Sequence, residues 1–134
     1  MMLIDSNIII YAAQPEYSAL RQFITQHSPL ISAVSYVEVL GFHGLNEQDR
    51  THFETFFAVA TVLPISQAVL DGAIRLRQTR RMSLGDALIA ATCLDHDLTL
   101  VTRNVADFDW VPHLRTLNPF DSSQIPAEDI ARRS

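Results

Sequence analysis

The chain has 134 residues, of which 48% are hydrophobic and 19% charged, and its formal net charge at pH 7 is −5. This length and apolar content predict one domain with a substantial core and exclude a disordered chain. The sequence has no apolar run long enough to span a membrane and no basic segment before its first apolar run, so we expect a cytoplasmic protein without a signal peptide. The acidic balance also counts against a protein that coats nucleic acid by charge alone, although a cluster of metal-binding acids would carry such a charge.

The N-terminal half alternates short apolar runs with segments of helical spacing. Ser6 or Asn7 can cap the first helix, which ends near Pro15, and Ser35 is expected to begin the third helix. In chain order, we expect a strand at residues 1–4, helices at 8–13 and 17–27, a strand at 30–32, and helices at 35–43 and 47–60.

The C-terminal half continues this alternation, with Ser66 and Ser83 as suitable N-caps for two further helices. In chain order, we expect a strand at residues 61–64, helices at 66–80 and 83–96, a strand at 98–102, a short turn or helix at 104–109, and a final strand at 114–117. The polar segment from Pro119 to Ser134 is expected to be a tail that is either loose or recruited by a partner, so the domain is predicted to span residues 1–118.

Short strands that alternate with helices predict an α/β fold, in which helices cover a parallel sheet. Ligands of such sheets bind at the carboxyl ends of the strands. Isolated carboxylates fall at strand ends or in the first turns of predicted helices, namely Asp5, Glu38, Asp86 and Asp107. Burying an isolated carboxylate is costly unless it is paired or holds a metal. The pattern therefore predicts one acidic pocket in which these side chains converge on a metal ion.

Each acid also has a purely structural explanation. Glu38 and Asp86 each follow a serine by three residues, as in a capping box. Asp5 could serve only as a helix cap, and Asp107 only as a turn residue. The two interpretations are compatible, because a helix N-terminus lowers the pKa of a carboxylate and keeps it ionised for a metal.

The residue types in the sequence limit which metal ions the chain can bind and which kinds of site it can form. Hard oxygen ligands suit Mg²⁺ or Mn²⁺, whereas the five histidines lack the spacing of a zinc site. All ten basic residues are arginine, which excludes a Walker-type phosphate loop and disfavours a response-regulator receiver. The arginines at 75, 77, 80 and 81 form either a solvated helix face or a contact with a phosphate backbone. Cys93, the only cysteine, is expected in the core.

Segments of the chain resemble a known family, and they are IDSN at 4–7, SYVE at 35–38, GDALIAA at 85–91 and LVTRNVADF at 100–108. Together they resemble the PIN-domain family of metal-dependent ribonucleases and, within it, the VapC toxins of bacterial type II toxin–antitoxin pairs. The resemblance covers roughly residues 1–118. It implies a PIN-like three-layer α/β/α sandwich with a parallel sheet in strand order 3-2-1-4-5.

The resemblance also implies the roles of individual residues. It places Mg²⁺, for which Mn²⁺ can substitute, on catalytic acids that match Asp5, Glu38, Asp86 and Asp107. Asp109 is an alternative for the fourth acid. Orientation of the acids or of the scissile phosphate is implied for Asn7, Thr102 and Asn104, and substrate contact for Arg103.

The implied activity is hydrolysis of a structured RNA such as tRNA, leaving a 5′-phosphate and a 3′-hydroxyl. The implied partners are an antitoxin protein whose C-terminal segment covers the acidic pocket and a second copy of the chain, for which the apolar helices near 36–57 are the candidate interface. One alternative is a catalytically silent PIN module that binds RNA or a protein. Another is a metal-dependent phosphomonoesterase or DNA nuclease, although Asn7 stands where such a phosphatase usually has a second aspartate.

Overall fold

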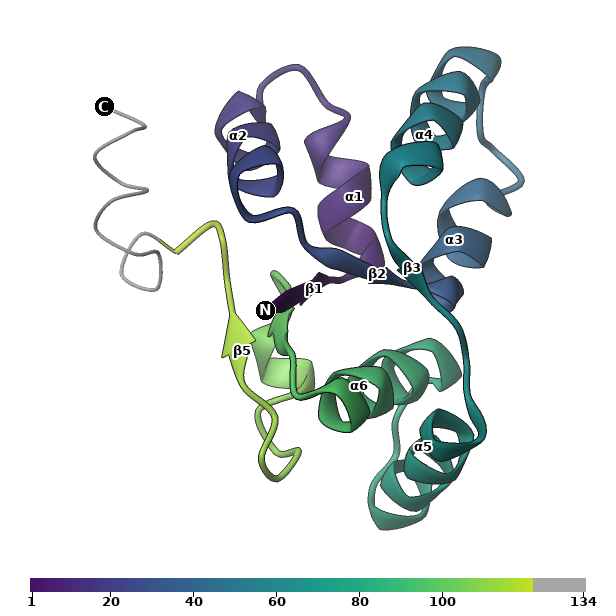
Figure 1. Ribbon diagram of the computed structural model, residues 1–134, viewed down its shortest axis with the longest axis vertical. Coiled ribbons are helices and arrows are strands. Elements are labelled where there is room, and N and C mark those ends of the chain that lie inside the picture. Colours follow the sequence, from purple (N-terminus) through teal and green to yellow (C-terminus); the bar gives the residue numbers. More distant parts are fainter. Residues whose placement is uncertain (122–134) are drawn as a thin grey trace.

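The computed structural model describes residues 1–121, and its centre is a five-stranded parallel sheet (Figure 1). The strands are β1 (Met2–Ile4), β2 (Leu30–Ser32), β3 (Val62–Leu63), β4 (Thr99–Val101) and β5 (Thr116–Leu117). Their order across the sheet is β3-β2-β1-β4-β5, and every neighbouring pair is parallel. This confirms the predicted α/β class and strand order. Because β1 and β4 are adjacent at the centre, their carboxyl ends lie side by side.

Helices cover both faces of the sheet. They are α1 (Ser6–Ala12), α2 (Ser18–His27), α3 (Ala33–Leu40), α4 (Glu47–Val59), α5 (Gln67–Thr79) and α6 (Leu84–His96), with a short 3₁₀ helix, η1 (Val105–Asp107). In Figure 1, α1, α2 and α4 lie on one side of the strands, and α5 and α6 lie on the other. Of the helices in residues 1–121, none is long and apolar enough to cross a membrane.

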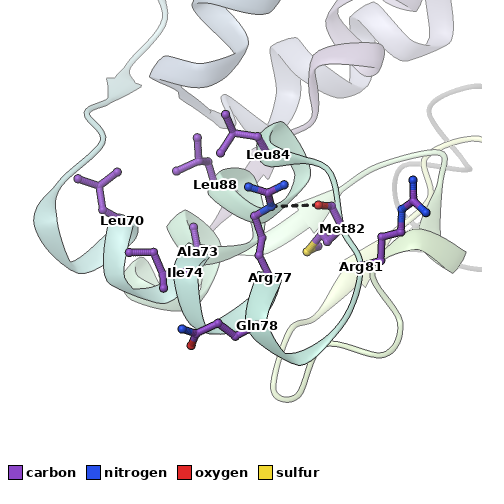
Figure 2. Close-up of a pocket in the computed structure, with 9 residues that line it drawn as sticks. All are labelled: Leu70, Ala73, Ile74, Arg77, Gln78, Arg81, Met82, Leu84 and Leu88. Carbon is purple, nitrogen blue, oxygen red and sulfur yellow. Dashed lines mark hydrogen bonds between the residues drawn. The ribbon is translucent and has the colours of Figure 1, made fainter.

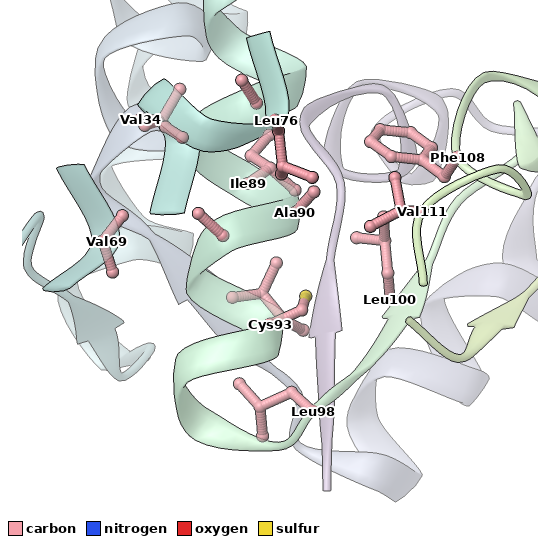
Figure 3. Packing of buried hydrophobic residues seen from close by; sticks show 14 residues of the cluster. Val34, Val69, Leu76, Ile89, Ala90, Cys93, Leu98, Leu100, Phe108 and Val111 are labelled. Carbon is pink, nitrogen blue, oxygen red and sulfur yellow. The ribbon is translucent and has the colours of Figure 1, made fainter. Parts of the chain in front are cut away.

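The side-chain alternation of the central strands builds a separate core on each face. Leu3 and Leu100 pack with buried residues of α5 and α6, and Figure 3 shows this cluster. Ile4 and Val101 instead pack with buried residues of α1, α2 and α4. Successive residues of one strand thus face opposite helical layers, which is the three-layer sandwich predicted from the sequence.

Two helix starts differ from the sequence-based expectation. Asp5, rather than Ser6 or Asn7, is the N-cap of α1, and its carboxylate accepts from the backbone N–H of Ser6, which confirms the alternative interpretation of Asp5 as a helix cap. The third helix begins at Ala33, with Ser32 as its cap, and not at Ser35. Ser32 is both the last residue of β2 and the N-cap of α3. Because the residues before it have the pattern of a strand, its role as a helix cap was not apparent from the sequence.

The end of the described chain packs on the domain. Pro119 is buried, and the ring of Phe120 meets the rings of Tyr11 and Tyr17 edge-on, with centroids 5.5 Å from each. Packing thus continues two residues beyond the predicted boundary at 118. Most of the predicted tail, residues 122–134, lies outside the described residues.

Candidate active site

The carboxylate of Asp5 is fixed between the first strand and the first helix. Its Oδ1 accepts from the Ser6 backbone N–H at 2.7 Å, and its Oδ2 accepts from the Thr102 hydroxyl at 2.9 Å. The residue is only 6% exposed. Its backbone N–H donates to the carbonyl of Val101 at 2.9 Å, which ties the ends of β1 and β4 together. Both carboxylate oxygens are therefore oriented before any ligand binds.

Thr102 connects Asp5 to the loop that follows β4. Its hydroxyl donates to Asp5 and also accepts from the backbone N–H of Asn104 at 3.1 Å, and the residue is fully buried. Asn104 stands at the N-cap of η1 with an exposed side chain that forms no capping hydrogen bond. Asn7 is also exposed, in the first turn of α1. The predicted orienting role thus has a visible contact for Thr102, whereas it stays a prediction for Asn7 and Asn104.

Glu38 reaches the site from the middle of α3, not from the first turn of a helix as the sequence suggested. The predicted capping box with Ser35 is wrong, because Ser35 is itself inside the helix and buried. Instead, Ser6 Oγ lies 2.8 Å from Glu38 Oε1 and 2.8 Å from Ser35 Oγ. Ser6, itself in contact with Ser35, thus holds the Glu38 side chain, a role that is hidden in the sequence because both serines fit helix caps.

Asp86 and Asp107 face a common pocket. Asp86 lies in the first turn of α6, where its backbone N–H donates to the capping hydroxyl of Ser83 at 3.2 Å, as predicted. Asp107 ends η1 and is exposed. Both line a pocket of about 490 Å³, together with Arg77, Arg81, Met82 and Ser83. Asp109 is not among the lining residues, so the geometry favours Asp107 as the fourth acid.

Electrostatic interactions join the four acids into one group. Burial raises the pKa of Asp5, and the charges of Asp86 and Glu38 raise it further, whereas hydrogen bonds from Thr102 and the Ser6 backbone lower it. Burial also raises the pKa of Asp86, to which Asp107 and Glu38 add, while a hydrogen bond with Ser83 lowers it. The acids are therefore close enough to repel one another, although they come from four separate segments of the chain.

The donor set fits a divalent cation by its chemistry. Asp5 is a buried carboxylate whose hydrogen-bond donors are a hydroxyl and a backbone amide, so a hard, oxygen-binding ion would offset its cost of burial. As they stand, no three His, Cys, Asp or Glu side chains within residues 1–121 form a group that could hold a metal ion. Glu38 and Asp107 are exposed, so their side chains have room to turn toward an ion near Asp5 and Asp86.

Arg103, the predicted substrate contact, is engaged elsewhere. Its guanidinium lies over the rings of Tyr11 and Phe120, at 5.1 and 4.6 Å from their centroids. It is not among the residues that line the pocket of Asp86 and Asp107. A role for Arg103 in substrate contact stays a prediction.

The fold agrees with comparisons to known proteins. The sequence model of the PIN domain family matches residues 2–113, so the chain belongs to the PIN domain family. Within this family it is similar to VapC proteins. Ribonuclease VapC10 from Mycobacterium tuberculosis is 32% identical over 123 residues, which are 86% of this chain and 91% of that protein. The resemblance inferred from the four sequence segments is thereby confirmed.

Solved structures support the same placement. A toxin-antitoxin complex from Klebsiella pneumoniae contains a chain with a TM-score of 0.73 and 26% identity, and the match covers 90% of this chain and 99% of that one. A chain of DNA-bound VapBC from Salmonella typhimurium gives a TM-score of 0.78 at 19% identity, covering 89% of this chain and 99% of that one. At 19% identity, the match to the Salmonella typhimurium chain shows similarity of fold alone.

Proposed function

We propose that this protein is a metal-dependent endoribonuclease that acts as the toxin of a type II toxin–antitoxin pair. The observation that carries the proposal is the convergence of Asp5, Glu38, Asp86 and Asp107 at the carboxyl edge of the central strands. The relative named Ribonuclease VapC10 supports the activity, and the relative in a toxin-antitoxin complex supports the biological role.

These acids would hold Mg²⁺, and Mn²⁺ could substitute for it. When bound, the ion neutralises phosphate charge and lowers the pKa of the attacking water. Asp5 is the best-fixed member, because Thr102 and Ser6 hold its two oxygens. The hydroxyl of Ser6 also contacts one oxygen of Glu38, so a single residue, through its backbone N–H and its hydroxyl, helps to set the spacing between two acids.

The reaction is hydrolysis of a phosphodiester bond. The oxygen of water bonds to phosphorus, the bond from phosphorus to the 3′-oxygen breaks, and that oxygen takes a proton. The products are a 5′-phosphate and a 3′-hydroxyl. The chain contributes orientation and a fixed cluster of negative charge, and the substrate class proposed is structured RNA such as tRNA.

The central test is cleavage of RNA by purified variants. Asp5→Asn and Asp86→Asn should each reduce the cleavage rate in Mg²⁺ by more than roughly 100-fold. Mutating a residue that only hydrogen-bonds to a metal ligand typically lowers activity by about 10–100-fold, and loss of a ligand itself should cost more. Asp109→Asn is the matched control, since Asp109 is an exposed acid two residues beyond Asp107 and outside the pocket. Undiminished cleavage by Asp5→Asn protein would contradict the assignment.

Other outcomes identify the competing functions. RNA binding without cleavage in either Mg²⁺ or Mn²⁺ would indicate a catalytically silent PIN module. Faster turnover of DNA or of a small phosphate ester than of RNA would indicate a DNA nuclease or a phosphomonoesterase. Each assay uses the full chain, with EDTA as the metal-free reference.

Two protein partners are part of the proposal. The first is an antitoxin encoded beside the toxin gene, which co-expression and co-purification would detect. The second is another copy of the chain, since Tyr36, Val37 and Phe42 on and after α3 expose 46%, 67% and 57% of their surface. Val37→Glu should shift such a dimer toward monomer in analytical ultracentrifugation, and an unshifted dimer would exclude this part of α3 from the interface.

A further inference from the structure

The basic stretch that ends α5 contains four arginines with different surroundings. Arg75 lines a separate pocket that it shares with Asp71 and Asp95. The guanidinium of Arg80 lies over the ring of Trp110, 5.4 Å from its centroid. The remaining two, Arg77 and Arg81, line the pocket that contains Asp86 and Asp107. The structure thus singles out two arginines that the sequence could not distinguish from their neighbours.

Arg77 and Arg81 differ in what they already bind. Arg77 Nε donates to the carbonyl of Met82 at 3.2 Å, so this side chain braces the connection between α5 and α6 (Figure 2). Arg81 is exposed and forms no hydrogen bond or ion pair within residues 1–121. Of the two, only Arg81 has its whole guanidinium available to a ligand.

Opposite charges line this pocket without contacting one another. Neither arginine forms an ion pair with Asp86 or Asp107 within the part of the chain that the structure describes. The pocket is about 490 Å³, large enough for a group to lie between the two walls. A ligand that suits both sides of the pocket presents an anionic group to the arginines and binds, together with the acids, a cation that lies between them.

A nucleic-acid backbone has this chemistry. The planar guanidinium donates two parallel hydrogen bonds to phosphate oxygens, a geometry that an ammonium group cannot match. We propose that Arg81 binds a backbone phosphate next to the scissile bond. This inference rests on the proposed function, because it assigns a specific RNA contact to the same site.

The test compares matched arginine variants of the full chain on one RNA substrate. Arg81→Ala should raise KM about tenfold with kcat within twofold, since it removes a binding contact rather than a metal ligand. It should also reduce the slope of log affinity against log salt by roughly one, which corresponds to one lost phosphate contact. Arg81→Lys should restore the salt slope but only part of the affinity, because it keeps the charge and loses the paired donors.

Arg75→Ala is the control, because it removes the same charge from the same basic stretch, although Arg75 lies on α5 and lines another pocket. It should leave KM and the salt slope unchanged. Equal effects of Arg75→Ala and Arg81→Ala would overturn the inference in favour of a diffuse charge effect. An Arg81→Ala protein that cleaves RNA with wild-type KM and salt slope would overturn it directly while leaving the proposed ribonuclease activity intact.

Filter binding of the same RNA separates this inference from the proposed function. If the wild-type chain binds RNA without cleaving it, weaker binding by Arg81→Ala alone still supports the phosphate contact. If the wild-type chain neither binds nor cleaves RNA, both proposals fail. If Arg81→Ala weakens only the complex with a co-expressed antitoxin, Arg81 is a protein-binding residue and the phosphate contact is overturned.

Discussion

A β-carbon placed on Gly85 would lie 2.9 Å from Oε2 of Glu38, closer than two such atoms can approach. Gly85 is the second residue of α6, and Glu38 belongs to α3, so this close approach occurs where the two helices meet at the site. The glycine of the GDALIAA segment is therefore explained by space for a carboxylate rather than by backbone conformation, since no glycine in residues 1–121 has a positive φ.

Gly85→Ala is expected to lower the rate of RNA cleavage while leaving the stability of the fold intact. Alanine favours a helix over glycine by up to about 1 kcal/mol, and Glu38 is a flexible side chain that can turn away, so the fold should be retained. The displaced carboxylate should leave the acid cluster and reduce RNA cleavage by at least about tenfold. Urea unfolding and cleavage rates measure the two effects. Glu38→Gln is the reference for loss of the acid, and a fully active Gly85→Ala protein would show that the position of Glu38 does not matter.

Thr102→Val tests the orientation of Asp5. The substitution keeps the shape of the side chain but removes the donor to Asp5 and the acceptor of the Asn104 N–H. Loss of the donor to the buried Asp5 carboxylate should cost about 1–3 kcal/mol of unfolding free energy. Because the lost hydrogen bond lowers the pKa of Asp5, this pKa should rise further and the acidic limb of the activity profile should move to higher pH.

Thr102→Ser is the matched control for this prediction, since serine retains the hydroxyl. It should keep both the acidic limb of the profile and most of the activity. If Thr102→Val leaves the profile in place, then Thr102 does not set the ionisation of Asp5, and its hydroxyl serves only the loop that follows β4.

Local patterns were sufficient to predict most of the fold and to select four acids that the structure brings near one another. The caps Ser66 and Ser83 were predicted because a serine before a helical run has one dominant use. Ser35 was assigned wrongly for the same reason: the spacing to Glu38 fits a capping box, yet the partner of Ser35 is Ser6, 29 residues away. A contact of that length depends on how the layers pack, which no local pattern contains.

The arginines show the same limit at the site. The residues from Arg75 to Arg81 are one basic stretch in the sequence, and helical spacing alone does not indicate which face meets the acids. In the structure, Arg75 lies on α5 and lines a different pocket, whereas Arg81 lies in the connection from α5 to α6 and lines the pocket of Asp86. The acids that line the pocket were therefore predictable from the sequence, whereas the two arginines that line it could be identified only from the tertiary structure.

Cys93 should be unreactive in the folded protein. The side chain is buried in the core between α6 and the sheet (Figure 3), and burial raises the pKa of its thiol to about 12. Since the thiolate is the reactive form, modification by a thiol reagent at pH 8 should be at least roughly 1000-fold slower than in urea-unfolded chain. Comparable rates in the two states would mean that this part of α6 opens readily.

Neutralising Asp86 should stabilise the metal-free protein. Burial raises the pKa of Asp86 in the folded chain above its ordinary value of 3.8, so the folded chain binds this proton more tightly than the unfolded chain does. The ionised form of Asp86 therefore destabilises the folded state, and this loss of stability develops as pH rises from below 3.8 through the raised folded pKa. Asp86→Asn removes this loss. In EDTA, the Tm of Asp86→Asn relative to wild type should therefore increase as pH is raised from about 4 to 7.

In saturating Mg²⁺, the wild-type protein should instead have a higher Tm than Asp86→Asn. A ligand that binds only the folded chain stabilises it by about 2.7 kcal/mol at a hundredfold excess over Kd, so wild-type Tm should rise with Mg²⁺. Asp86→Asn should gain much less, because it lacks one of the proposed ligands, and Asp109→Asn should respond as wild type does, since Asp109 lies outside the pocket. Equal Mg²⁺ shifts in wild-type and Asp86→Asn protein would remove Asp86 from the proposed metal site, even if the cleavage assay still required its carboxylate.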